Sequence, residues 1–293
     1  MDYKLLATDM DGTLLMDDKA LSTENIEALT RGKEHGIDLA ICTGRPFPTV
    51  KPYLEQLGIS CWLVTNNGSV IRDKQENIIY EKFMEQDALE KIIDIFESEK
   101  DLYYHVSDAN HTYIKSRRQR MRTIQKFVSI KNMSPIKAYV TAAKMVFLSG
   151  THKKVDFLSY VKNGGKVASV FVYSKDNIQL NRLKEKLSEI KSINVTSSGS
   201  DNIEILDGNA TKGHALEYLS KKLDIQAEEM IAVGDNYNDL SMIQYAGLGV
   251  AMRNGEQAII DEADWVTKTN QENGVAFLME KVLAEEIKII KIS

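Results

Sequence analysis

The sequence predicts an α/β fold, a doubly wound parallel-sheet core interrupted by an inserted α/β domain. Both ends of the chain alternate short apolar runs, typical of buried strands, with amphipathic runs of helical period. The middle carries aromatic-rich, antiparallel-like segments such as LYYHV and SVFVY and a basic stretch. No linker, internal repeat or low-complexity tract separates these regions. We therefore expect a discontinuous core, 1–84 and 198–293, and an inserted domain at 85–197.

The order of the predicted elements implies parallel strands joined by right-handed crossovers. Ser22 is a predicted N-cap, and Gly36 and Gly58 are predicted helix stops. In the first third we expect strands 3–8, 37–42 and 61–65, helices 22–36 and 46–58, and a hairpin at 69–80. In the last third we expect strands 230–234, 248–252 and 264–267, and helices 212–225, 239–246, 255–263 and 274–283.

The composition is that of a soluble globular protein, with 43% hydrophobic and 27% charged residues. No apolar run approaches the ~20 residues that span a bilayer, and no basic-then-apolar signal segment opens the chain. The net charge of −5 does not suggest nucleic acid or an anionic membrane as a partner. Cys42 and Cys61 lie in strand-like runs, where two buried thiols in a reducing cytosol are favoured over a disulfide. We expect a cytoplasmic protein.

Polar residues follow four of the predicted strands, and in an open parallel sheet ligands bind beyond the carboxyl ends of the strands. Lys212, at the start of a helix in the same domain, can reach this edge. The groups that follow the strands are Asp9-Met10-Asp11-Gly12-Thr13, Thr43-Gly44-Arg45, Asn66-Asn67-Gly68 and Asp235-Asn236-Tyr237-Asn238-Asp239.

Clustered carboxylates repel each other unless a cation neutralises them or one becomes protonated. Asp9 and Asp235, together with a backbone carbonyl, suit Mg²⁺, which prefers oxygen ligands and keeps several waters. No dense Cys/His cluster points to zinc. Lys212, the Thr43 hydroxyl and backbone amides of the tight turns are suitable donors to a substrate phosphate.

The two opening acids have different predicted roles. Asp9, beside the cation and a phosphate, is placed to attack phosphorus and form an aspartyl-phosphate. Asp11 lies farther out and is the predicted acid and base, which protonates the leaving oxygen and then activates water. Gly12 permits the turn, and Thr13 is expected to hold it by a local side-chain hydrogen bond.

The segments DMDGTLL, CTGRP, ATKG and GDNYNDLSMIQYAG, in this order, resemble the four motifs of the haloacid dehalogenase superfamily. The segments NNGS, GLGVAM and DWVT resemble its Cof-type branch of bacterial sugar-phosphate phosphatases with a large α/β cap. The resemblance covers about 180 residues of the core and implies a Rossmann-like fold. It implies Asp9 as nucleophile and ligand, Asp11 as acid/base and as a ligand through its carbonyl, and Asp235 as third ligand. Asp239 matches a position that works through water in relatives, and the implied phosphate contacts are the Met10 amide, Thr43, Gly44, Lys212 and Asn238.

These observations predict Mg²⁺-dependent hydrolysis of a small phosphomonoester, with a sugar phosphate favoured and the inserted domain selecting the leaving group. Three alternatives use the same fold: a phosphotransferase or mutase, a phosphatase of flavin or pyridoxal phosphates, and a non-catalytic sensor. The intact set of Asp9, Asp11, Lys212 and Asp235 argues against the sensor. A D-x-D metal site of a nucleotide-sugar transferase explains neither Thr43, Lys212 nor the second acidic turn.

The basic segment KSRRQRMR, 115–122, is interpreted as a solvated face without the interleaved aromatics of an RNA-binding surface. The alternative is that one or two of its four arginines, Arg117, Arg118, Arg120 and Arg122, bind a second anionic group on the substrate. His35, His152 and His214 are placed on helices with packing or surface roles. Arg45 is predicted to contact the substrate or the inserted domain, with capping of carbonyls as the alternative. The role of Arg253 and the oligomeric state are not predicted.

Overall fold

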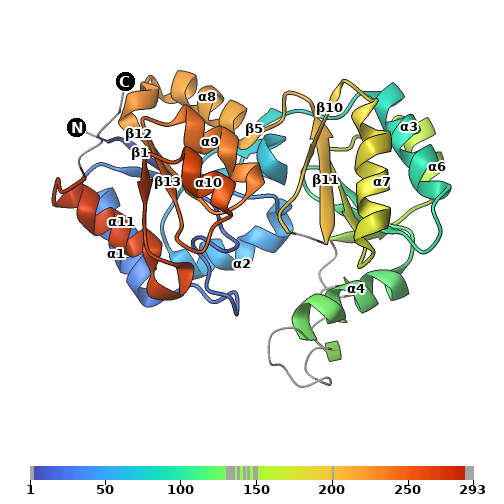
Figure 1. Cartoon of the computed structure of the whole chain (residues 1–293), viewed down its shortest axis with the longest axis horizontal. Coiled ribbons are helices and arrows are strands. Elements are labelled where there is room, and N and C mark those ends of the chain that lie inside the picture. The colour runs from blue at the N-terminus through green and yellow to red at the C-terminus, as the bar shows by residue number, and fades with distance from the viewer. Residues whose placement is uncertain are drawn as a thin grey trace. The chain divides into compact units, whose positions relative to one another are not determined.

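The structure is a computed structural model of the chain that describes residues 3–129, 136, 139–140, 143, 146–147, 151–199 and 201–287 (Figure 1). The chain divides into two compact units, here called the core unit and the cap unit. The core unit comprises Met1–Arg45, Thr49–Glu81 and Asn209–Ser293, and the cap unit comprises Pro46–Pro48 and Lys82–Gly208. The predicted inserted domain, 85–197, lies within the cap unit.

In the described residues, the core unit contains an eight-stranded sheet in the order β14-β13-β12-β1-β2-β3-β4-β5. Neighbours from β14 to β3 pair in parallel, whereas β4 and β5 form an antiparallel edge, as the predicted hairpin requires. The strands are β1 (Leu5–Thr8), β2 (Asp38–Cys42), β3 (Trp62–Thr65), β4 (Val70–Arg72), β5 (Ile78–Glu81), β12 (Met230–Gly234), β13 (Leu248–Ala251) and β14 (Trp265–Val266).

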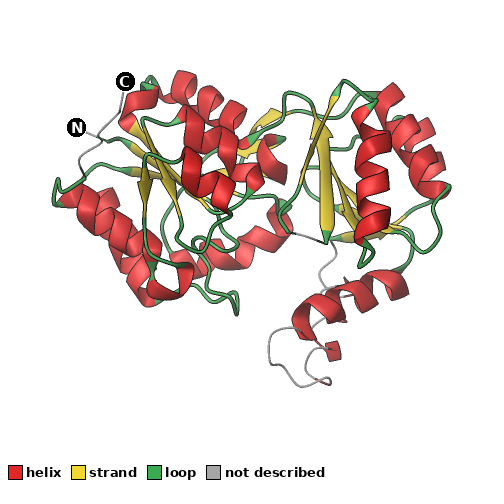
Figure 2. Ribbon diagram, viewed as in Figure 1, coloured by secondary structure: helices red, strands yellow, loops and turns green. Residues whose placement is uncertain are grey.

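Helices cover both faces of this sheet, which is why its central strands are apolar throughout (Figure 2). Helices α8 and α9 bury one face in a cluster that includes Leu5, Ala7 and Leu216. Helices α1 and α11 pack together on the other face, so closely that a Cβ on Gly32 would lie 2.7 Å from the Met279 side chain. The helices are α1 (Thr23–Glu34), α2 (Phe47–Leu57), α8 (Lys212–Leu223), α9 (Leu240–Tyr245), α10 (Gln257–Glu262) and α11 (Gly274–Leu283). The predicted doubly wound core is confirmed.

A side-chain cap begins α1 as the sequence predicts. The Ser22 hydroxyl accepts a hydrogen bond from the backbone N–H of Asn25 at 3.1 Å, which satisfies a donor that the first turn leaves without a partner. Thr211 caps α8 in the same way and accepts from the backbone N–H of His214. The cap on α8 positions Lys212, the first residue of that helix, at the carboxyl edge of the sheet.

In the described residues, the cap unit contains a six-stranded sheet in the order β10-β11-β9-β6-β7-β8. It is antiparallel except for the β7–β8 pair, and helices α3, α6 and α7 cover one of its faces in a single apolar cluster (Figure 1). The strands are β6 (Tyr103–Ser107), β7 (Thr112–Ile114), β8 (His152–Lys154), β9 (Ser169–Tyr173), β10 (Ile193–Thr196) and β11 (Asn202–Asp207). The helices are α3 (Gln86–Glu97), α4 (Arg117–Ser129), α6 (Phe157–Lys162) and α7 (Asn177–Ser188).

Two expectations for the cap unit are corrected. His152 begins strand β8 and does not lie on a helix, because the short run HKK pairs in parallel with β7. The basic segment 115–122 is not uniformly a solvated face: Arg117, Arg118 and Arg122 are exposed on α4, but Arg120 is half-buried and contacts the sheet. Among the described residues, no helix is long and apolar enough to cross a membrane.

Candidate active site

The predicted site residues gather at one edge of the core sheet. Strands β12, β1, β2 and β3 are parallel neighbours, so their carboxyl ends lie side by side. Asp9 follows β1, Thr43 follows β2, and Asp235 follows β12. Segments more than 200 residues apart in the sequence are therefore brought together by strand order alone.

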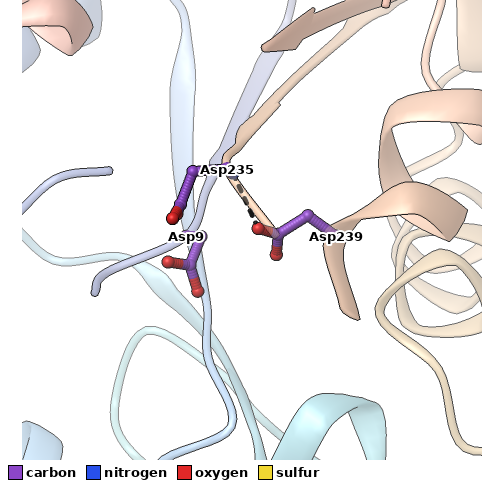
Figure 3. Close-up of side chains that lie close together, drawn as sticks. All are labelled: Asp9, Asp235 and Asp239. Carbon is purple, nitrogen blue, oxygen red and sulfur yellow. Dashed lines mark hydrogen bonds between the residues drawn. The ribbon is translucent and has the colours of Figure 1, made fainter. Parts of the chain in front are cut away.

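Three carboxylates form the centre of this edge (Figure 3). Asp9, Asp235 and Asp239 each present one oxygen to a group whose members all lie within 4.8 Å of one another. Asp9 and Asp239 are buried, and Asp235 is partly buried. So much like charge in so small a volume requires compensation.

Lys212 supplies part of that compensation. Its side chain is fully buried, and its Nζ donates hydrogen bonds of 2.6 Å to Oδ1 of Asp9 and to Oδ1 of Asp239. The second oxygen of Asp239 accepts from the backbone N–H groups of Asp235, at 2.9 Å, and Asn236, at 3.0 Å. Both oxygens of Asp239 thus have donors, which makes it a support for Lys212 and leaves Asp9 and Asp235 as the carboxylates suited to a cation.

The remaining charge imbalance is visible in the pKa values. Burial raises the pKa of Asp9 to about 7; Lys212 lowers it in part, and Asp239 raises it. Burial also raises the pKa of Asp235 to about 8, with further contributions from Asp9 and Asp239. One ammonium among three clustered carboxylates leaves an excess of negative charge. An all-oxygen donor set with this excess fits a hard divalent cation such as Mg²⁺.

The turn after β1 is shaped around Asp235. Gly12 has φ +86°, and a Cβ at this position would lie 2.4 Å from Oδ2 of Asp235. A side chain is therefore excluded both by the left-handed backbone and by the carboxylate. The Thr13 hydroxyl donates to Oδ1 of Asp235 at 2.7 Å. This corrects the expectation of a local bond: Thr13 holds a residue 222 positions away, because β1 and β12 are neighbours.

Asp11 is bound by two cations. Arg45 donates to it from Nε at 2.5 Å and from Nη2 at 2.6 Å, and Nζ of Lys19 lies 2.6 Å away. About 33% of the Asp11 side chain is exposed. Burial would raise the pKa of Asp11, but Arg45 and Lys19 outweigh it and hold the pKa well below its ordinary value. Arg45 also stacks on Tyr53, 5.0 Å from the ring centroid. In this structure Arg45 holds Asp11 as a carboxylate, and its contact with the substrate stays a prediction.

Comparison with known proteins identifies the family. The model of haloacid dehalogenase-like hydrolases matches residues 6–279. The chain is 33% identical to the 5-amino-6-(5-phospho-D-ribitylamino)uracil phosphatase YwtE of Bacillus subtilis, over 96% of this chain and 98% of that protein. It is 31% identical to phosphatase YwpJ of the same organism, over 96% of this chain and 100% of that protein. A haloacid dehalogenase-like hydrolase from B. subtilis has a structure with TM-score 0.83 at 30% identity, covering 94% of this chain and 99% of that one. This chain belongs to the haloacid dehalogenase-like hydrolases.

The family relationship confirms the resemblance found in the motifs and makes this hydrolase a phosphatase. The predicted phosphate-contacting residues lie at the same edge as the carboxylates. Thr43 is buried, and its hydroxyl accepts from the backbone N–H of Arg45 at 3.2 Å. Asn238 donates to Oδ1 of Asn67 at 3.0 Å, which joins the turns after β12 and β3. Met10 and Gly44 stand beside Asp9 and Thr43 in the chain. The individual roles of these residues stay predictions.

Two interactions of this hydrolase were not anticipated. The ammonium of Lys19, in the turn after the first motif, lies 2.6 Å from Oδ1 of Asp11. A lone lysine in a polar loop carries no sequence signal for such a contact. Asp239 was known as a motif acid, but its hold on Lys212 depends on the order of strands and the cap on α8. The sequence did carry a signal for the contact between Lys212 and Asp239, because a buried lysine requires a carboxylate partner.

Proposed function

We propose that this hydrolase catalyses Mg²⁺-dependent hydrolysis of small phosphomonoesters, with sugar phosphates favoured, through an aspartyl-phosphate on Asp9. The observation that supports this most strongly is the buried chain Asp9–Lys212–Asp239. The 2.6 Å bond from Lys212 fixes the orientation of the Asp9 carboxylate, and Asp239 fixes Lys212. A carboxylate held this firmly is suited to attack phosphorus in line with the leaving oxygen.

Different residues of the site would stabilise different charges during the reaction. Lys212 and the donors near Thr43 would stabilise the negative charge of the transferring phosphoryl group. Mg²⁺, held by Asp9 and Asp235 and by the carbonyl of Asp11 that the family resemblance implies, would neutralise the remaining carboxylate charge so that a phosphate dianion can approach. The Thr13 hydroxyl orients Asp235, as supporting hydrogen bonds commonly orient metal ligands. Asp11 would protonate the leaving oxygen and later activate water.

The proposed acid role of Asp11 places a condition on Arg45 and Lys19. With both cations in contact, the pKa of Asp11 is held far too low for it to carry a proton near neutral pH. Asp11 can therefore act as an acid only after at least one of these cations leaves its carboxylate. The reaction as proposed includes that exchange of partners.

A second substrate class is favoured by the relatives. YwtE, 33% identical over nearly the whole of both chains, is named for the hydrolysis of 5-amino-6-(5-phospho-D-ribitylamino)uracil. A phosphate ester of a sugar alcohol attached to a heterocycle is also within the flavin-like class considered from the sequence. The chemistry at Asp9 would be the same for either class.

The decisive experiment measures phosphate release from sugar phosphates, the ribitylaminouracil phosphate, flavin mononucleotide and pyridoxal phosphate, with Mg²⁺ and with chelator. We expect Mg²⁺-dependent release by the wild type and a loss of at least about a thousandfold in Asp9→Asn. Circular dichroism checks that the variant is folded. Added acceptor sugars test for transfer, since a transferase would yield a new phosphate ester instead of phosphate. No release from any ester by a folded wild type would overturn the hydrolase proposal.

A further inference from the structure

The cap sheet has an apolar face and a polar face. On β6, Tyr104 and Val106 belong to the apolar cluster under α3, α6 and α7, so Tyr103 and His105 point to the opposite side. Strand pairing extends this alternation to the neighbouring strands. Residues of the polar face that are 7% exposed or less include Tyr103, His105, Ser107, Thr112, His152 and Glu204. A sheet face with so many buried polar groups is unusual for purely structural packing.

Helix α4 places one guanidinium against this polar face. Nη1 of Arg120 donates to the Tyr103 hydroxyl at 3.0 Å and lies 3.4 Å from Nδ1 of His105. Nε of Arg120 donates to Nε2 of His152 at 3.3 Å. Three side chains from two strands, none of them a carboxylate, therefore hold the guanidinium in a defined orientation.

None of these acceptors balances the charge of Arg120. Burial, together with the nearby Arg120 and His152, holds the pKa of His105 well below its ordinary value, and burial raises the pKa of Tyr103. In the part of the chain that the structure describes, no carboxylate forms an ion pair with Arg120, and no group accepts a hydrogen bond from its Nη2. Arg120 thus keeps a full positive charge and two N–H donors on the Nη2 edge.

The surrounding sequence does not supply a counter-charge. Between Asp108 and Asp156 there are 11 lysines and arginines and no acidic residue, although the whole chain has a net charge of −5. Arginines in the first turn of α4 also oppose the helix dipole, so they do not stabilise that helix. A positive charge that benefits neither its helix nor an ion pair is best explained by a ligand of opposite charge.

We propose that Arg120, held by His105, His152 and Tyr103, binds an anionic oxygen group, a carboxylate or a phosphate, in the cap unit. The two N–H groups of Nη2 provide charge-assisted donors that such groups accept. The anion belongs either to a second charged group of the phosphatase substrate or to a separate small ligand. In the first case the inference rests on the proposed function and narrows its substrates to phosphate esters that carry a second anionic group.

The first arm of the test uses two esters of equal length. In 6-phosphogluconate a carboxylate replaces the terminal hydroxymethyl group of glucitol 6-phosphate. Arg120→Gln is expected to lower kcat/KM for the carboxylate ester by about tenfold or more, since hydrogen bonds to charged groups contribute this much. It should leave the neutral ester within about twofold. Arg120→Lys restores part of the preference, and Arg118→Gln, an exposed neighbour on α4, changes neither ester.

The second arm needs no catalysis. Malonate is titrated into the full-length, ¹⁵N-arginine-labelled protein, with neutral malonamide as the control. We expect the Nε–H resonance of Arg120 to shift saturably with malonate and to stay unchanged with malonamide. The Arg118→Gln variant should behave as the wild type, and Arg120→Gln identifies the resonance by its loss.

The outcomes separate the two sources of the anion. A malonate shift together with a change in ester preference places the anion on the substrate, whereas a malonate shift alone indicates a separate ligand. If neither effect is seen, the inference is overturned, and Arg120 serves only to link α4 to the sheet. If no ester is hydrolysed at all, the proposed function fails, but the malonate titration still decides whether the anion site exists.

Discussion

The two units of this phosphatase treat a buried or half-buried cation in opposite ways. In the core unit, Lys212 is fully buried and contacts two carboxylates at 2.6 Å each. In the cap unit, Arg120 is half-buried and contacts two imidazoles and a phenol, none of which is a carboxylate. The core unit has more negative charge than its own cation balances, and the cap unit has positive charge without a partner carboxylate among the described residues.

The difference indicates that the sign of the unbalanced charge in each unit predicts the sign of the ligand that the unit binds. Buried ions without partners are costly, so a protein keeps them where a ligand completes the balance. The excess carboxylate charge around Asp9 fits a divalent cation, and the guanidinium of Arg120 fits an anion. The charge that the protein's own groups leave unbalanced is thus negative in the core unit and positive at Arg120 in the cap unit.

The largest effect is expected from Lys212→Met, which removes the cation and nearly conserves volume. Asp9 and Asp239 would be left buried without their shared donor, a change that typically costs about 3–5 kcal/mol. Phosphatase activity should fall below detection. Tryptophan fluorescence during urea unfolding measures the loss of stability, because the protein's two tryptophans, Trp62 and Trp265, both lie in the core unit.

The matched control for this variant is the double substitution Lys212→Met with Asp239→Asn. It removes one of the two carboxylates that lose their donor, so part of the stability should return while activity does not. If Lys212→Met alone unfolds at the same urea concentration as the wild type, the buried ion chain is not what holds this edge of the sheet together.

The sequence allowed the core fold and the position of its site to be predicted because both depend on local signals. Apolar runs predict strands, caps such as Ser22 predict helix starts, and the polar residues after each strand predict a common edge. The partners across the sheet were harder to predict. Thr13 binds Asp235 because β12 lies beside β1, and no local pattern specifies that neighbour.

The cap unit shows where local signals are insufficient. His152 lies in a three-residue strand that forms by pairing with β7. Three residues are too few to show the alternating pattern that predicts a strand from the sequence. The four arginines of 115–122 look equivalent in the sequence, yet the helical turn directs Arg120 toward the sheet and leaves Arg118 exposed. Which face of a basic helix is buried depends on what packs against it.

An intermediate effect is expected when pH is changed in the absence of divalent cations. The folded pKa values of Asp9 and Asp235, about 7 and about 8, exceed the ordinary value of 3.8. At pH values between 3.8 and these folded pKa values, the folded state binds more protons than the unfolded chain. Stability therefore falls as pH rises from about 5 to about 8. The fluorescence Tm in chelator should fall by at least about 2–4 °C, the equivalent of one kcal/mol in a chain of this size.

Mg²⁺ should reverse this trend, since its ligands must be deprotonated before they bind. We expect the ion to raise Tm more at pH 8 than at pH 5 and expect the pH dependence in chelator to be smaller in Asp235→Asn. The lowered pKa of His105 has the opposite effect on stability, but His105 belongs to the cap unit, whereas both tryptophans belong to the core unit. A Tm in chelator that rises between pH 5 and pH 8 would contradict the proposed excess of carboxylate charge.

The smallest effect is expected from Arg120→Met, the counterpart of Lys212→Met in the cap unit. No carboxylate among the described residues is left without its partner, and Tyr103 can still donate to Nδ1 of His105, 3.3 Å away. The free energy of unfolding of the cap unit should therefore change by about 1 kcal/mol or less, the net value of ordinary hydrogen bonds. Hydrogen exchange of the β6 and β9 amides measures this stability without a tryptophan. A loss of stability as large as that of Lys212→Met would show that Arg120 is a structural cation. The two units would then differ in how their cations are held, and not in the charge of the ligand that each binds.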